Sequence, residues 1–80
     1  MTKEEFFTAV AAYLGEPEYN ETIGYGRWRR GAGGGRFIGH GVIRYYNDSN
    51  ILVLLVTPHL AGKFSSPEDA LNAIKSVSIQ

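Results

Sequence analysis

The sequence predicts an α+β domain of two layers, in which a helix, a three-stranded antiparallel meander and a second helix follow one another in the order αβββα. Three observations lead to this fold class. Both ends of the chain carry helix-capping residues next to apolar residues at helical spacing, the middle is rich in β-branched and aromatic residues, and turn-forming clusters interrupt that middle. The length of 80 residues suits one domain, residues 1–80. Whether the helices cover one face of the sheet or both is left open by the sequence.

The first helix is predicted from both of its ends. Thr2 and Glu5 have the spacing of a capping box, which begins a helix over residues 3–14. Gly15 and Pro17 then end it, because glycine suits a helix C-cap and proline cannot continue a helix. The apolar residues that repeat at helical spacing are Phe6, Val10, Tyr13 and Leu14.

A second helix is predicted near the other end of the sequence. Ser66 is a helix cap, Pro67 suits the first helical position, and Asp69 follows the cap by three residues. This helix should end near residues 76–78. Its apolar stripe consists of Ala70, Leu71, Ile74 and Val77.

Three strands are predicted between the helices. A glycine-rich loop, residues 31–35, separates the first two strands, and a turn of Asn, Asp and Ser at residues 47–50 separates the last two. Residues 58–65 are expected to form a loop. The predicted strands cover residues 22–30, 36–46 and 51–57.

The pairing of these strands divides their residues between two faces. Closing the first hairpin over the glycine loop sets like residues opposite each other, as Gly24–Gly41, Gly26–Gly39 and Trp28–Phe37. Tyr46 is expected to pair with Ile51. A helix backbone is expected to approach the strip of glycines closely. The predicted core face holds Gly24, Gly26, Trp28, Phe37, Gly39, Gly41, Ile43, Tyr45, Leu52, Leu54 and Val56. The predicted opposite face holds Tyr25, Arg27, Arg29, Arg36, His40, Arg44 and Tyr46, with the aliphatic residues Ile23, Ile38, Val42, Ile51, Val53 and Leu55.

The net charge of the chain is zero, but its positive charge is concentrated in one segment. Residues 22–47 contain five arginines and no acid, whereas residues 1–21 contain one lysine and five glutamates. A partner senses such a local surface within a Debye length of about 8 Å at physiological salt. The alternative is internal neutralisation, in which Glu16, Glu18 and Glu21 pack near the arginines.

The basic segment is also rich in aromatic residues, and its combination with aliphatic residues on one face favours a small non-enzymatic protein-binding module, an adaptor or an inhibitor. Its target would be a nucleic-acid-processing complex, as for short domains that phages and other mobile elements encode. A homodimer through the sheet face remains open. The alternative is a nucleic-acid-binding module that uses the same hairpin. The residues expected to bind the partner are Tyr25, Arg27, Arg29, Arg30, Arg36, His40, Arg44 and Tyr46.

No catalytic residue, cofactor or metal site is predicted. The glycine loop lacks the terminal lysine and the following helix of a P-loop, and neither Gly24-Tyr25-Gly26 nor Gly39-His40-Gly41 continues as a dinucleotide-binding fingerprint. Cysteine is absent, and His40 and His59 have no other ligand type at the spacing of a known metal site. The longest apolar run, residues 51–56, is too short to span a bilayer. The acidic residues 1–5 lack the order of a secretory signal, so we expect a cytoplasmic protein.

The order of helix, three-strand meander and helix resembles that of double-stranded-RNA-binding domains over most of the chain. That family contacts phosphates through lysines at the start of its second helix. This sequence has Ser66, Pro67, Glu68 and Asp69 at the corresponding position, where duplex RNA would be repelled. The sequence is therefore not assigned to that family, and any nucleic-acid contact is expected at the hairpin and the sheet face.

Overall fold

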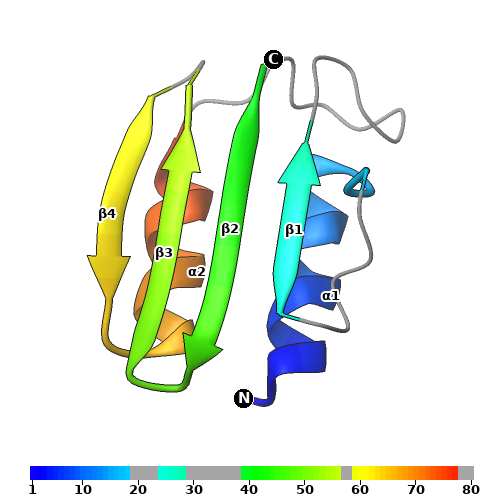
Figure 1. Cartoon of the computed structure of the whole chain (residues 1–80). Helices are drawn as coiled ribbons and strands as arrows, with labels where there is room; N and C mark the ends of the chain where they lie inside the picture. Colours follow the sequence, from blue (N-terminus) through cyan, green and yellow to red (C-terminus); the bar gives the residue numbers. More distant parts are fainter. Residues whose placement is uncertain (19–23, 29–38, 57–58, 78–80) are drawn as a thin grey trace.

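The computed structural model describes residues 1–18, 24–28, 39–56 and 59–77, which form two layers. Four antiparallel strands make one sheet in the order β1-β2-β3-β4, and both helices lie on the same face of it (Figure 1). The fold is therefore α+β, with four described strands where the sequence predicted three. The elements are α1 (Lys3–Leu14), β1 (Tyr25–Trp28), β2 (Gly41–Asn47), β3 (Asn50–Leu55), β4 (Leu60–Phe64) and α2 (Pro67–Ser76).

The helices begin where their capping residues predict. The Thr2 side chain accepts a hydrogen bond of 3.1 Å from the backbone N–H of Glu5, and the Thr2 N–H donates one of 2.8 Å to the Glu5 carboxylate. Gly15 ends α1 with a φ of 101°, a conformation that favours glycine. The Ser66 hydroxyl caps α2 by accepting a hydrogen bond of 3.1 Å from the backbone N–H of Asp69. Neither helix is long and apolar enough to cross a membrane, and no other helix is found in the described part of the chain.

The fourth strand, β4, was expected to be part of a loop. Its central residues, Ala, Gly and Lys, have low strand propensity, which hides the strand in the sequence. Tertiary packing overrides that propensity, because Leu60 and Phe64 at its two ends pair with β3 and pack against the core. The strand is short and carries Lys63, both of which are common in edge strands.

The register between β2 and β3 differs from the prediction by one residue. Tyr45, rather than Tyr46, lies opposite Ile51, while Asn47 lies opposite Asn50, so Tyr46 is an extra residue in a bulge. A shift of one residue turns every side chain of a strand to the other face. The prediction for β3 was therefore wrong: Ile51, Val53 and Leu55 are buried in the core, and Leu52, Leu54 and Val56 are on the other face.

The register between β1 and β2 also differs, but without changing the faces. Trp28 lies opposite Gly41 rather than Phe37, a shift of four residues. Because four is an even number, the side chains keep the faces that the sequence predicted. Ile43 is fully buried and Arg44 is exposed, as that assignment requires.

The core lies between the sheet and the two helices, and Trp28 is its largest fully buried side chain. The Trp28 indole N–H donates a hydrogen bond of 2.7 Å to the backbone carbonyl of Gly15 at the end of α1. The rings of Trp28 and Phe7 occupy the space above Gly26, so side chains fill the strip of glycines where a helix backbone was expected. The buried apolar residues are Phe6, Phe7, Val10, Leu14, Trp28, Ile43, Tyr45, Ile51, Val53, Leu55, Ala70, Leu71 and Ile74.

Tyr45 is a buried residue of β2 whose hydroxyl donates a hydrogen bond of 2.5 Å to Asp48 Oδ1 in the turn before β3. Burial is the main cause that raises the pKa of Tyr45 to about 12, and the hydrogen bond and charge of Asp48 raise it further. The bond joins the bulged end of β2 to the turn. It therefore helps to fix the register that decides which face of β3 is buried.

We expect the Tyr45 hydroxyl to make the fold sensitive to alkali. Its pKa is raised in the folded chain from 10.0 to about 12, so its contribution to stability is complete below pH 10 and is lost as the pH rises toward 12. The urea concentration at half-unfolding, measured across this range, should fall more steeply for the wild type than for Tyr45→Phe. Tyr46→Phe is the control, because this ring is 59% exposed. An equal fall of the urea midpoint in Tyr45→Phe would show that the Tyr45 hydroxyl does not cause the sensitivity to alkali.

Candidate protein-binding surface

The face of the sheet turned away from the helices is the candidate binding surface, and we call it the open face. Figure 1 shows it turned toward the viewer, with α1 and α2 behind the strands. The pairing register and the alternation of side chains along each strand assign residues to it. They are Tyr25, Arg27, His40, Val42, Arg44, Leu52, Leu54, Val56, Ala61 and Lys63.

An aliphatic stripe lies in the middle of the open face, along β3 and the residue that follows it. It consists of Leu52, which is half-buried, Leu54, which is 45% exposed, and Val56, which is 53% exposed. The half-buried Val42 on β2 lies opposite Leu54 and widens the stripe. Adjacent exposed aliphatic residues of this kind are typical of surfaces that bind another macromolecule.

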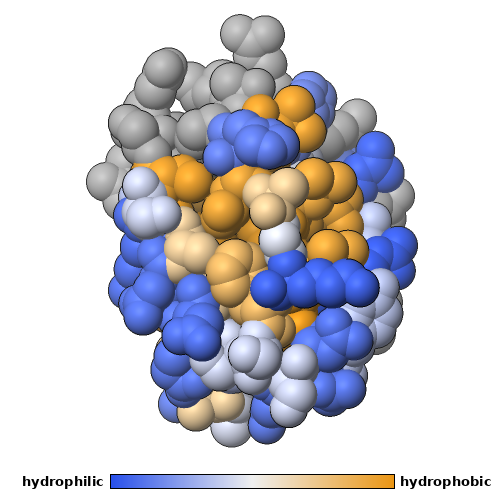
Figure 2. Space-filling model, turned by 90° about the vertical axis from the view of Figure 1, so that its left-hand side faces the viewer, coloured by the Kyte–Doolittle hydropathy of each residue, from blue (hydrophilic) through white to orange (hydrophobic). Residues whose placement is uncertain are grey.

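The β4 edge of the sheet also carries apolar residues. Figure 2 views the molecule from that side and shows hydrophobic residues gathered between hydrophilic ones. Half-buried Leu60 and Phe64 of β4 are on its helix side, where they pair with the buried Leu55 and Ile51 and pack against the core. On the open face itself, Ala61 and Lys63 border the stripe at this edge.

Cations lie on both sides of the aliphatic stripe. One row across the sheet runs Tyr25, Arg44, Leu52, Lys63, so that Arg44 on β2 and Lys63 on β4 are neighbours of Leu52. The next row runs Arg27, Val42, Leu54, Ala61. The stripe is thus apolar along its length and basic at its borders, which is the arrangement of an apolar centre and a polar rim in protein interfaces.

The acidic residues of the described segments are all outside the strands. None of β1 to β4 contains Asp or Glu, and the acids lie in α1, α2, the β2–β3 turn and the segment after α1. The strands are therefore basic, and four of the seven acids of the described residues lie in the two helices. The asymmetry that the sequence showed along the chain becomes an asymmetry between the two layers.

Two cations of the open face have partners within this chain. The Arg44 guanidinium lies over the Tyr25 ring, 4.6 Å from its centroid, which is a cation–π contact. Arg27 Nε lies 3.9 Å from Glu18 Oε2, so the expected neutralisation of the arginines by the segment after α1 occurs at this position. Glu16 is exposed, and Glu21 lies outside the described residues.

The residues that the sequence proposed for binding are only partly within the described segments. Tyr25, Arg27, His40 and Arg44 lie on the open face, and the exposed Tyr46 lies beside it in the bulge. The structure thus brings together residues that are up to 21 positions apart in the sequence (25 to 46). Outside the described residues lie Arg29, Arg30 and Arg36 of the proposed site, the loop 31–35, and also Ile23, Phe37 and Ile38.

Sequence reasoning missed the aliphatic stripe and Lys63. The stripe was assigned to the core because a bulge at Tyr46 has no clear signal in a run of alternating apolar residues. The close pair Asn47 and Asn50 around two turn residues was the available hint, since a two-residue turn implies a different register from a four-residue turn. Lys63 was missed because β4 was not recognised as a strand.

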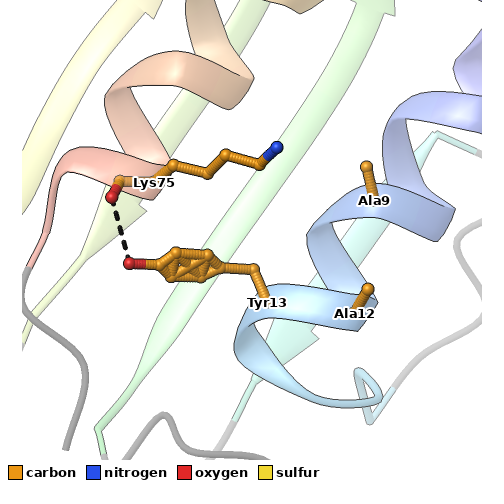
Figure 3. A pocket seen from close by; sticks show the side chains of 4 residues that line it. All are labelled: Ala9, Ala12, Tyr13 and Lys75. Carbon is orange, nitrogen blue, oxygen red and sulfur yellow. Dashed lines mark hydrogen bonds between the residues drawn. The ribbon is translucent and has the colours of Figure 1, made fainter.

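A hollow lies between α1 and α2 and has a volume of about 270 Å³ (Figure 3). Ala9, Ala12, Tyr13 and Lys75 line it. The Tyr13 hydroxyl is placed to donate to the backbone carbonyls of Lys75 at 3.0 Å and Val77 at 2.9 Å. This hydroxyl ties the end of α2 to α1, so we assign the hollow a structural role.

The remaining chemistry of the described segments is limited. Within residues 1–18, 24–28, 39–56 and 59–77, no three His, Cys, Asp or Glu side chains gather in a way that could hold a metal ion. Comparison of the chain with models of known protein families, with curated proteins and with solved structures found no match.

Proposed function

We propose that this chain is a small protein-binding module, an adaptor or an inhibitor, that docks through the open face. The observation that carries the proposal is the exposed aliphatic stripe with cations at its borders, on a sheet face that neither helix covers. Burial of an exposed leucine or valine contributes about 25 cal/mol for each Å² removed from water. A partner that covers the stripe gains this energy without any change in the fold.

The charges of the open face suit recognition of a partner. Arg27, Arg44 and Lys63 lie around the stripe, and the strands that carry them contain no acid. Charges at the rim of an interface contribute mainly to association rate and to specificity. The stripe would thus contribute affinity, while the cations would select a partner with complementary charge.

Binding of single-stranded nucleic acid through the same face is the second candidate. Such platforms stack unpaired bases on aromatic rings and contact phosphates through cations. The open face carries Tyr25, with Tyr46 beside it, but the Arg44 guanidinium already lies over the Tyr25 ring. The middle of the face, over β3, carries aliphatic side chains, which cannot stack on bases. These features favour the protein partner.

A capture experiment with matched variants tests the proposal. The wild type, Leu54→Asp and Asn72→Asp are immobilised and exposed to cell extract; Leu54 is on the open face and Asn72 is an exposed residue of α2. Far-UV circular dichroism confirms that each variant is folded. We expect proteins retained by the wild type and by Asn72→Asp to be lost with Leu54→Asp, because a buried aspartate disrupts an apolar contact.

Two outcomes would contradict the protein-binding proposal. One is retention of the same proteins by Leu54→Asp. The other is specific binding of short single-stranded oligonucleotides, with a slope of log affinity against log salt of about −0.7 for each neutralised phosphate. The second outcome would support the nucleic-acid alternative.

A further inference from the structure

We infer that the occupant of the open face is an amphipathic helix of a protein partner, with acidic residues on both sides of its apolar stripe. This inference rests on the proposed function and specifies the partner's chemistry. It is carried by the width of the aliphatic stripe, its length, and the sign of the charges at its borders.

The width of the stripe suits one helix. Neighbouring strands lie about 4.8 Å apart, so the backbone positions of Arg44 on β2 and Lys63 on β4 are about 10 Å apart, with β3 between them. An α-helix with its side chains is about 10 Å across. A helix that lies along β3 would therefore have one cation on each side.

The length of the stripe suits a short helix. Leu52 and Val56 are four residues apart, which is about 13 Å along an extended strand. About nine helical residues cover this length at 1.5 Å each, or two and a half turns. A helix presents apolar residues at positions i, i+3 or i+4, and i+7 over that span. Val42 and Ala61, the neighbours of Leu54 in its row, are smaller than leucine and leave room for such side chains.

The charges select an acidic partner and disfavour a second copy of this chain. No carboxylate of the described residues lies within 4 Å of Arg44 or Lys63. Two copies packed face to face would bring cation-rich surfaces together, and like charges across an interface oppose binding. A helix with glutamates on both flanks would instead place carboxylates next to Arg44 on one side and Lys63 on the other.

Designed peptides of about 15 residues, a length at which an isolated helix becomes marginally stable, provide the probe. One peptide has leucines at i, i+3, i+4 and i+7 with glutamates on both flanks, and its matched control has lysines in place of the glutamates. Binding is followed by the chemical shifts of the protein. We expect the glutamate peptide to bind about tenfold more tightly than the lysine peptide, because it makes several additional surface ion pairs. Shifts should concentrate at Leu52, Leu54 and Val56.

Exchanging the charges on the protein provides the decisive control. In the variant Arg44→Glu/Lys63→Glu, the preference should reverse, and the lysine peptide should bind more tightly than the glutamate peptide. Leu54→Asp should weaken binding of both peptides, whereas Asn72→Asp should bind like the wild type. A preference that does not reverse would overturn the inference, as would shifts that lie on α1 and α2 instead of β3.

Other occupants give other results. A mass that doubles with concentration in sedimentation equilibrium, and that Leu54→Asp returns to the monomer, would show that a second copy covers the face and would overturn the inference. Failure of both peptides, together with capture of a protein that Leu54→Asp abolishes, would overturn the acidic helix and leave the protein-binding proposal intact. Capture that does not depend on Leu54 would instead contradict the proposed function itself.

Discussion

The variant Trp28→Ala is expected to lose about 4 kcal/mol or more of its free energy of unfolding. Trp28 is 1% exposed, and replacing a buried tryptophan by alanine typically costs about 3–5 kcal/mol through lost burial and the cavity left behind. Its indole N–H also satisfies the Gly15 carbonyl, and leaving a buried acceptor without a partner costs about 1–3 kcal/mol. At roughly 0.05–0.15 kcal/mol for each residue, a chain of 80 residues has a total of only about 4–12 kcal/mol.

Urea unfolding followed by far-UV circular dichroism measures this loss, because removal of the one tryptophan also removes the usual fluorescence signal. Trp28→Phe is the matched control. It keeps an aromatic ring and removes the N–H donor, so its loss should lie between those of the wild type and of Trp28→Ala. If Trp28→Ala unfolds at the same urea concentration as the wild type, Trp28 does not join α1 to β1 as described.

The variant Gly24→Ala is expected to lose roughly 2–4 kcal/mol of its free energy of unfolding, although the substitution adds only one methyl group. Gly24 has a φ of 82°, a conformation that residues with a side chain rarely adopt. A Cβ there would lie 2.7 Å from the backbone oxygen of Tyr45, and a backbone atom in a strand cannot move aside as a side chain can. The Tyr45 N–H also donates a hydrogen bond of 2.7 Å to the Gly24 carbonyl, which holds the two segments close.

Gly62→Ala is the control, and it should raise the free energy of unfolding, whereas Gly24→Ala should lower it. A Cβ at Gly62 would meet only the Phe64 ring, at 3.6 Å, which is an ordinary contact. Alanine also restricts the unfolded chain more than glycine does, so Gly62→Ala should gain about 0.5–1 kcal/mol. Equal effects of the two substitutions on the urea midpoint would contradict the close approach at Gly24.

The helices could be predicted because their signals are local. The cap at Thr2, the glycine at position 15 and the cap at Ser66 each act on backbone groups a few residues away, and all three have the predicted role. The existence of three strands was also predictable, from composition and turn residues. The strand β4 was not, because the stability of a segment such as Ala61–Gly62–Lys63 depends on pairing with β3 rather than on its own preferences.

At the candidate site, the predicted face of each side chain depends strongly on the register between strands. The exposed positions of Arg27 and Arg44 were predicted although the pairing of Trp28 was wrong, because the error was an even number of residues. The aliphatic stripe was assigned to the wrong face because the bulge at Tyr46 introduced an error of one. Since β3 is apolar on both faces, its own sequence contains no alternation that could have revealed the mistake.

The bulge at Tyr46 also has a consequence for which side chains of β3 lie on the open face. Both sets of β3 residues are aliphatic and of similar size, so the core could accept either of them with modest repacking. Pairing of Tyr46 instead of Tyr45 with Ile51 would remove the bulge and turn β3 over, so that Ile51, Val53 and Leu55 would lie on the open face. A slip of one residue in this pairing could thus replace the central side chains of the open face together, while the cations on β1 and β2 stayed in place.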